Sequence, residues 1–321
     1  MLQQTRVTAA RPYFERFLRR FPTVDTLAAA PVADVLKHWE GLGYYSRARN
    51  LQTAAREIVA RHSSRIPASA AALAQLPGIG PYTAAAIASI CFHEPVPVVD
   101  GNVARVFSRY LGWTDDFRKL PARRKLAVWL QPHIMAVACP GDFNQAMMEL
   151  GALACLPHTP LCDQCPLATA CHAHCTGTQE KFPVRPAHKS VPTRHACAVV
   201  IRRRGRLLLV QRREQGLLGG FWELPGGETK RKPDARTAAT AVKSQTGLIV
   251  SDLSANGMIE HVFSHFRLQL VLFAAGGSAG RLRANARARW VHAAALVHLL
   301  FSTAHRRALQ LCIAATRKPR Q

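Results

Sequence analysis

Five cysteines lie within twenty-one residues of this 321-residue chain, and their spacing constrains how that segment can fold. Four of them form the pattern Cys155-x6-Cys162-x2-Cys165-x5-Cys171, and Cys175 lies just outside it. In a long chain without a secretory signal segment, such a group favours metal binding over disulfides. One Cys-x-x-Cys pair with two outlying cysteines suits an iron–sulfur cube better than a zinc ribbon, which usually has two such pairs. We therefore expect a metal-binding loop, with zinc as the alternative metal and Cys175 as a substitute ligand.

The charge of the chain favours a polyanionic partner. There are 43 Lys and Arg against 19 Asp and Glu, a formal net charge of +24. Nucleic acid is the commonest partner of so basic a protein, although mere solubility or contact with anionic lipid are the alternatives. Because no apolar run is long enough to cross a bilayer, we expect a cytoplasmic, nucleoid-associated protein with no membrane partner.

The chain divides into two predicted domains of different class. Residues 1–178 predict an all-α domain, because Gly and Pro separate successive helical segments and no alternating stretch occurs. Residues 195–321 predict an α+β domain, with a hairpin around Arg204-Gly205 and a helix over 235–245. Residues 179–194 contain three prolines and predict a stiff linker. The four scattered cysteines stand among apolar residues and are predicted to lie in the core: Cys91, Cys139, Cys197 and Cys312.

A basic stretch follows the first domain. From Phe182 to Arg213 there is no acidic residue, whereas nine residues are Lys or Arg. A solvated loop would explain this composition. A connector that lies against phosphates fits the overall charge better.

The segment LPGIGPYTAAAIASI, residues 76–90, predicts a tight turn between two helices. Gly78 and Gly80 permit the turn, and the second helix begins near Pro81. Open backbone amides at a helix start form an anion site, so such a hairpin can hold a DNA phosphate without reading a base. A plain structural turn is the alternative, and the charge of the chain favours the phosphate site.

Asp100 follows the hairpin by about twenty residues, at the start of the next predicted helix, near Asn102. Helix capping explains an aspartate at this place. A carboxylate close to a phosphate site could also act on a sugar carbon.

Together these features resemble helix-hairpin-helix DNA glycosylases that carry a [4Fe-4S] cluster, and among them the MutY-type adenine DNA glycosylases. The resemblance covers residues 1 to about 175 and continues more loosely to the end. It rests on MLQQTRV, PYFERFLRRFPTV, WEGLGYYSRARNL, LPGIGPYTA, VVDGNVARV, FNQAMMELGA and the four cysteines. It implies removal of adenine mispaired with 8-oxoguanine or guanine in double-stranded DNA during base excision repair, by a monomer whose cluster is held by Cys155, Cys162, Cys165 and Cys171.

The resemblance also implies roles for single residues. Asp100 is the carboxylate beneath the sugar, Tyr82 hydrogen-bonds to it, and Gln145 reads the adenine edge. Gln3, Gln4, Thr5 and Tyr44 match residues that open the duplex beside the lesion; a polar helix face and a core aromatic are the plain alternatives. Relatives that cleave the strand carry a lysine at the position of Tyr82. Without that amine no imine forms, which implies a monofunctional enzyme.

The resemblance places the general acid, a glutamate, two residues before the methionine of MLQQT, where this sequence begins. Either the start is assigned to an internal methionine of a longer protein, or the protein is a shortened, catalytically impaired binder of DNA lesions. We favour the first account because the other motifs are intact. We expect the 321-residue polypeptide to bind DNA but to release adenine poorly, since losing a general acid costs about 10²- to 10⁴-fold in rate.

The second domain resembles a Nudix domain that has lost its catalytic box. Counting back from Gly247, the places of the box carboxylates hold Thr240, Ala241, Ser244 and Gln245. Nucleotide hydrolysis needs clustered carboxylates that bind magnesium, so a Nudix hydrolase is the least favoured function. The resemblance implies instead that Phe263, Ser264 and His265 contact the oxidised guanine. The plain alternative is a strand end with Phe263 packed inward and His265 exposed.

Overall fold

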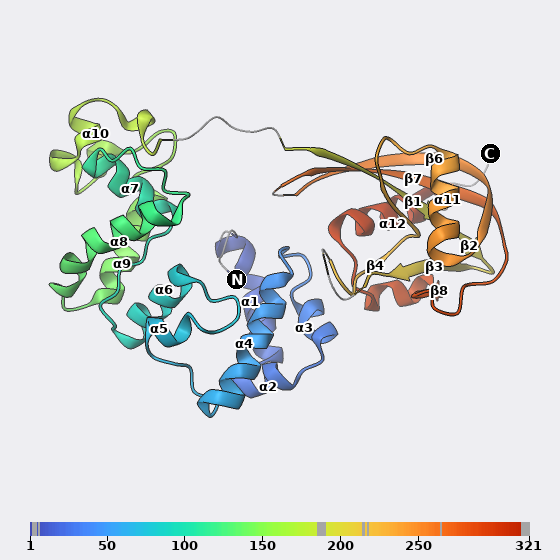
Figure 1. Cartoon of the computed structure of the whole chain (residues 1–321), viewed down its shortest axis with the longest axis horizontal. Coiled ribbons are helices and arrows are strands. Elements are labelled where there is room, and N and C mark those ends of the chain that lie inside the picture. Colours follow the sequence, from blue (N-terminus) through green and yellow to red (C-terminus); the bar gives the residue numbers. More distant parts are fainter. Residues whose placement is uncertain are drawn as a thin grey trace. The chain divides into compact units, whose positions relative to one another are not determined.

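The computed structural model describes residues 1, 5, 7–184, 191–213, 216, 218–263 and 265–315, with side chains to residue 312 (Figure 1). The chain forms two compact units. The first comprises residues 1–38 and 46–188, and the second comprises residues 39–45 and 189–321. Within the described residues, no helix has the length and apolar character that a membrane crossing requires.

The first unit is helical, as the sequence predicts. Its α-helices are α1 (Val7–Arg20), α2 (Val24–Ala29), α3 (Val32–His38), α4 (Ser46–His62), α5 (Ala70–Leu73), α6 (Pro81–Phe92), α7 (Gly101–Leu111), α8 (Leu120–Met135), α9 (Pro140–Leu153) and α10 (His172–Cys175). Short 3₁₀ turns cover Cys162–Gln164, Ala168–Ala170 and Gln179–Lys181. Helix α5 ends at Leu73, and turns continue from there to the hairpin.

Two apolar clusters support the elements around Asp100. Small residues allow α6 to pack closely on α5, and the cluster, which also takes in residues of α4, includes Ala54, Ile58, Leu73, Leu76, Ala84 and Ala88. A second cluster joins α7, α8 and α9 through Val103, Phe107, Leu126, Leu130 and Leu150. Cys155 and Cys165 pack against this second cluster. The cysteine loop therefore rests on the core that also holds α7.

The second unit is α+β, which confirms the predicted class. Its strands are β1 (Thr193–Val200), β2 (Arg202–Arg203), β3 (Arg206–Gln211), β4 (Trp222–Glu223), β5 (Gly226–Thr229), β6 (Ile249–Val262), β7 (Arg267–Ala279) and β8 (Ala288–His292). Its helices are α11 (Ala235–Thr246), the 3₁₀ helix Ala293–His298 and α12 (Thr303–Ala315).

The strands form two sheets. One has the order β5-β1-β7-β6, with β1 and β7 parallel and the other pairs antiparallel. The other has the order β2-β3-β4, with β8 also paired to β3. Because side chains alternate along a strand, β1 supplies two cores. Ala196, Ala198 and Val200 face the core that contains α12 residues, and Cys197, Val199 and Ile201 face the core that contains α11 residues.

The scattered cysteines only partly follow the prediction. Cys197 and Cys312 are buried, whereas Cys91 and Cys139 are exposed, so the prediction was wrong for these two. Cys91 lies in the last turn of α6, and Cys139 lies just before α9. Apolar neighbours in sequence do not bury a residue at a helix end, where the chain leaves the core.

Candidate functional site

The predicted hairpin between α5 and α6 is present. Gly78 has a φ of +77°, and a Cβ there would lie 2.5 Å from Cβ of Asn50, so both backbone conformation and space require glycine. Gly80 is the N-cap of α6 and has no side chain to satisfy the first amides, and Pro81 follows at the first helical position. Both glycines are exposed. The turn therefore presents a helix start that no side chain covers.

Asp100 caps α7, which begins one residue before the predicted Asn102. Its backbone is extended (φ −95°, ψ −172°), and its Oδ1 accepts a hydrogen bond from the Val103 amide at 2.7 Å. The residue is half-buried. One carboxylate oxygen is thus fixed by the helix, as capping predicts.

Tyr82 lies in the first turn of α6 and is 37% exposed. Burial raises the pKa of its hydroxyl, and the negative charge of nearby Asp100 raises it further, so the phenol stays protonated. The predicted hydrogen bond to Asp100 is wrong for this structure. The hydroxyl contacts Met148 Sδ on α9 at 3.7 Å instead, where α6 and α9 pack together.

Two neighbours on α9 have opposite environments. Gln145 is exposed, and its side-chain amide makes a long bond to the Gly141 carbonyl, at 3.4 Å. It lies one turn before Met148, on the face that carries the Tyr82 contact. Asn144 is 2% exposed and joins three partners: the Val98 amide, the Ser89 hydroxyl and the Val96 carbonyl. No clear signal in the sequence marks this second role, because α9 also carries Asp142, Gln145 and Glu149.

Arg105, which was not predicted as a functional residue, connects the Asp100 region to the cysteine loop. Its side chain is 8% exposed and donates to Asn102 Oδ1 at 2.9 Å, to the Gly151 carbonyl at 2.6 Å and to the Cys155 carbonyl at 2.8 Å. A buried guanidinium at the second turn of α7 therefore ties that helix to the end of α9. The signal available was an arginine within the apolar pattern of α7.

The four predicted cluster cysteines lie on one loop between α9 and the end of α10, and all are half-buried free thiols. Burial raises the pKa of the Cys171 thiol, and Cys155 and Cys162 raise it further, so these sulfurs lie near one another. Within the described residues, no three His, Cys, Asp or Glu side chains converge closely enough to hold a metal ion. The loop carries the predicted ligands without bringing them into a ligand geometry.

Nitrogen donors already point at these sulfurs. Arg109, only 3% exposed, donates to Cys155 Sγ at 3.3 Å and to the Leu156 carbonyl at 2.7 Å. Gln179 Nε2 lies 3.8 Å from Cys162 Sγ. Hydrogen bonds to sulfur are the usual surroundings of iron–sulfur clusters, so this donor set fits such a group.

The predicted duplex-opening residues are only partly described. Thr5 is half-buried, and its hydroxyl lies 3.5 Å from Arg47 Nη2. Tyr44 is 49% exposed and has a φ of +48°, which places it at the tip of a turn rather than in a core. Gln3 and Gln4 lie outside the described residues.

Within the described residues, the α11 region of the second unit shows no group of carboxylates that could bind magnesium. Gln245, at one former carboxylate position, accepts a hydrogen bond from the Gly226 amide at 2.9 Å, and Ser244 accepts one from Arg283 through its backbone carbonyl. Neutral side chains thus stand at these former box positions, where carboxylates would be needed to bind magnesium.

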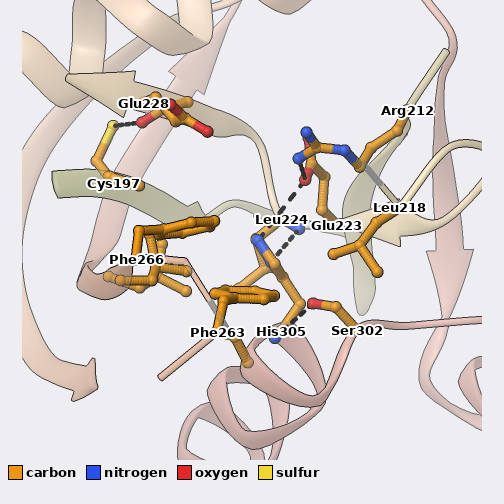
Figure 2. A pocket seen from close by; sticks show the side chains of 15 residues that line it. Cys197, Arg212, Leu218, Glu223, Leu224, Glu228, Phe263, Phe266, Ser302 and His305 are labelled. Atoms are coloured by element: carbon orange, nitrogen blue, oxygen red, sulfur yellow. Dashed lines mark hydrogen bonds and ion pairs between the residues drawn. The ribbon is translucent and has the colours of Figure 1, made fainter. Parts of the chain in front are cut away.

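The turn between β6 and β7 has the inward phenylalanine and the exposed histidine of the plain alternative. The Phe263 ring stacks on Phe266 with centroids 4.5 Å apart, and the Phe263 amide donates to the Phe266 carbonyl. His265 is exposed, and Ser264 lies outside the described residues. Phe263 and Phe266 line a small pocket, in which Figure 2 shows Phe263 beside His305.

Charged groups close the other side of this pocket (Figure 2). Arg212 pairs with Glu223 at 2.8 Å, and His305 Nδ1 accepts from the Leu224 amide. Burial, and then the charge of Arg212, lower the pKa of His305 to about 4. Burial raises the pKa of Glu223 although Arg212 opposes this. The polar side chains in this wall of the pocket are therefore already paired: Arg212 with Glu223, and His305 with the Leu224 amide.

Two family models match the chain. Residues 1–132 match the HhH-GPD superfamily base excision DNA repair protein, and residues 196–311 match the NUDIX domain. These ranges correspond to the helical unit and to the α+β unit. They confirm the helix-hairpin-helix and Nudix-like assignments of the two parts.

Adenine DNA glycosylases are similar to the chain over most of its length. The mouse protein is 32% identical, with 97% of this chain and 70% of that protein covered. The protein of Buchnera aphidicola subsp. Acyrthosiphon pisum is 33% identical, with 84% and 75% covered. The human protein is 35% identical, with 84% and 58% covered, so the chain spans about three-fifths of the length of that relative. The chain belongs to the adenine DNA glycosylase family.

Proposed function

We propose that this protein is a monofunctional DNA glycosylase that hydrolyses the bond between adenine and deoxyribose where adenine is paired with 8-oxoguanine or guanine. The observation that carries the proposal is the half-buried Asp100 carboxylate beside the protonated Tyr82 hydroxyl, following an exposed Gly-rich helix start. The similarity to adenine DNA glycosylases supports the choice of base. We further propose that it acts as a monomer in the cytoplasm, on the nucleoid.

The hairpin would hold the DNA backbone. The exposed turn at Gly78 and Gly80 leaves room for a phosphate, and the positive end of the α6 dipole attracts it. Such a contact positions the duplex without reading sequence. Thr5 and Tyr44, with Gln3 and Gln4, would open the duplex beside the adenine so that the base can leave the stack.

Asp100 would act on the sugar. As the adenine departs, positive charge develops at the anomeric carbon, and a carboxylate stabilises that charge or captures it covalently. Oδ1 is held by the Val103 amide, so Oδ2 is the oxygen directed to the sugar. Tyr82 adds no second negative charge, because its pKa is raised. Without a lysine at this position the reaction ends at base release.

Gln145 would recognise the base. A glutamine amide donates and accepts, which matches the donor and acceptor atoms on the adenine edge. Its exposure, one turn from the Met148 that contacts Tyr82, leaves it available to a base near Asp100.

Cys155, Cys162, Cys165 and Cys171 would hold a [4Fe-4S] cluster. When bound, the cluster crosslinks the loop through four iron–thiolate bonds and supplies no group to the reacting sugar. Arg109 and Gln179 would donate to the ligand sulfurs, as they do to the free thiols. The hydrogen bonds of Arg105 would then connect that loop to α7, the helix that Asp100 caps.

The second unit would recognise the oxidised base. Phe263, Ser264 and His265 would contact the 8-oxoguanine opposite the adenine. The neutral residues at the former box positions argue against nucleotide hydrolysis by this unit.

The test is adenine release under single-turnover conditions from a duplex that contains adenine opposite 8-oxoguanine. It uses the 321-residue polypeptide and one extended upstream to include the expected glutamate. We expect release by the extended chain, much slower release by the shorter chain, and tight duplex binding by both. Borohydride should trap no imine with either. Duplex binding without release by the extended chain would favour a lesion-binding protein and contradict the glycosylase.

A further inference from the structure

The basic stretch that the sequence suggested as a connector does not stay together in the folded second unit. Arg194 lies at the start of β1, where it pairs with Glu228 and covers the Phe266 ring. Arg212 lies inside the Phe263 pocket, paired with Glu223. Between them, residues 202–206 form the β2–β3 hairpin, which lies at the far end of β1. The stretch is thus divided among the start of β1, the Phe263 pocket and the β2–β3 hairpin beyond the end of β1, and it contributes to both sheets.

The β2–β3 hairpin gathers arginines with the end of β7. Arg204 and Gly205 form its tip with positive φ values of 48° and 73°, and Arg206 follows directly. Arg203 donates to the Ser278 carbonyl of β7 at 3.1 Å. The chain continues from there into the loop that carries Arg281 and Arg283. We call Arg204, Arg206, Arg281 and Arg283 the far-end arginines.

These arginines are poorly neutralised. All four are exposed, and Arg204, Arg206 and Arg281 have no carboxylate partner within the described part of the chain. Asp252, at the same end of β6, lies beside Gly276 and forms no ion pair with them in that part. Unpaired arginines in proximity repel one another, and a polyanion relieves that repulsion. Arginine also matches phosphate geometry better than lysine does.

The far-end arginines are remote from the expected lesion contact. The Phe263–His265 turn precedes β7 at Arg267, and the far end follows β7 at Ala279. Thirteen residues of strand span about 40 Å. One duplex turn is about 35 Å, so a backbone contact at the far end is separate from a lesion held at the turn.

We propose that the far-end arginines form a second, sequence-independent binding site for the phosphate backbone of duplex DNA. This inference rests on the proposed function only for the first site. The ligand is duplex DNA rather than a lipid surface, because the cluster is made of arginines, and in the described part of the chain α11, the helix that accepts a hydrogen bond from Arg283, exposes no large apolar side chain that could enter a bilayer. A protein with both sites binds a lesion and a neighbouring or second duplex at once.

The test compares the parent with the triple variant R204N/R206Q/R281Q. Asn suits the positive φ at residue 204, so the hairpin should remain folded. The matched control is R61Q/R65Q/R124Q, which removes three exposed arginines from the first unit. Binding of an unmodified 30-base-pair duplex is measured across salt concentrations. If three phosphate contacts are lost, the parent should lose about 40-fold more affinity than the triple variant between 50 and 200 mM salt.

A second measurement separates this site from the lesion site. With a short lesion duplex bound to the full chain, a labelled unmodified duplex should form a ternary complex with the parent and the control but not with the triple variant. Adenine release from the short duplex, measured on the chain extended upstream, should be unchanged by the triple variant. Equal salt dependence in parent and triple variant, or an equal decrease in the control, would overturn the proposal. The proposal would also be overturned if the triple variant lost binding to vesicles of anionic lipid while its duplex binding stayed equal to that of the parent. If the proposed glycosylase function is wrong, base release will be absent, but the parent and the triple variant will still differ in their binding of the unmodified duplex.

Discussion

Asp100 and Asp234 cap their helices in the same way. Each lies in extended backbone, and each accepts through Oδ1 from the amide three residues later at 2.7 Å: Val103 for Asp100, Thr237 for Asp234. The two caps belong to different units, and only Asp100 lies beside a tyrosine hydroxyl whose pKa its charge raises. Comparison of the two residues therefore distinguishes the effect of a capping carboxylate on its helix from any additional role of Asp100 in the reaction.

Replacement of Asp100 by Asn tests its chemical role. Asn caps helices as well as Asp, so the fold of α7 should persist. We expect D100N to lower the rate of adenine release by about 10²- to 10⁴-fold, because a neutral amide cannot stabilise the developing charge. Single-turnover kinetics on the extended chain measure this. D234N is the control, and it should release adenine at the parent rate; an equal loss in both variants would contradict the role.

The two hairpin glycines should respond differently to alanine. G78A forces a Cβ into Asn50 at a positive φ, and should cost about 2–3 kcal/mol of unfolding free energy. G80A adds a Cβ in open space at a φ of −82° and should cost less than about 1 kcal/mol, mainly because Ala is a poor N-cap. Urea unfolding of both variants checks the order. The reverse order would refute this account of the turn.

Arg105 should matter more for stability than an exposed arginine. R105Q leaves the Cys155 and Gly151 carbonyls without their donor in a buried place, and should lower the unfolding free energy by about 3 kcal/mol. R118Q, which removes an exposed pair with Asp116, should have no measurable effect. Chemical denaturation of the two variants side by side tests this. Comparable midpoints would show that the buried guanidinium is dispensable.

The cysteine loop makes a prediction about metal content. C171S should abolish iron and sulfide binding in protein purified without oxygen, because a four-iron cube needs four thiolates. C175S should retain both, since Cys175 lies outside the four-cysteine spacing and is exposed. Iron, sulfide and zinc analysis, with visible absorbance, gives the answer. Zinc without sulfide would exclude the cluster, and loss of iron in C175S would change the ligand set.

His305 should make the second unit sensitive to acid. Its pKa is about 4 when folded and about 6.5 when unfolded, so between these values the unfolded chain binds a proton that the folded chain does not. Stability therefore falls as the pH falls through this window, by about 3 kcal/mol at most. H305N keeps an acceptor for the Leu224 amide but cannot titrate.

Urea midpoints at pH 7 and pH 4.5 measure the effect, and the parent should lose more stability than H305N. The raised pKa of Glu223 acts in the opposite sense, since its contribution is lost as the pH rises, and it remains in both proteins. Equal acid sensitivity in the two would mean that His305 is not the responsive group.

The sequence predicted the types of helices, strands and turns well, but it predicted poorly which side chains are buried. Gly78, Pro81 and Asp100 mark helix boundaries through local backbone chemistry, and the hairpin and cap lie where they predict. Cys91 and Cys139 were misplaced because burial at a helix end depends on distant packing. Arg105 and Asn144 were missed for the same reason, since their partners lie tens of residues away.

The basic run from 182 to 213 shows a related limit. Composition gives the charge of a segment, but it does not show where in the folded unit the strands place the charged residues. Several arginines of the run became structural, among them Arg194 on Phe266 and Arg212 on Glu223, while the hairpin tip stayed exposed. Only the register of β1 along β7 reveals that separation.

The hydrogen bond between Asp100 and the Val103 amide restricts the orientation of the Asp100 carboxylate. A side chain with one oxygen anchored cannot rotate freely, so the orientation of its second oxygen is inherited from the first turn of α7. Fraying of that turn would misdirect the carboxylate while the rest of the unit stays folded. Substitutions that loosen the beginning of α7 should consequently impair the proposed release of adenine at temperatures well below those that unfold the protein.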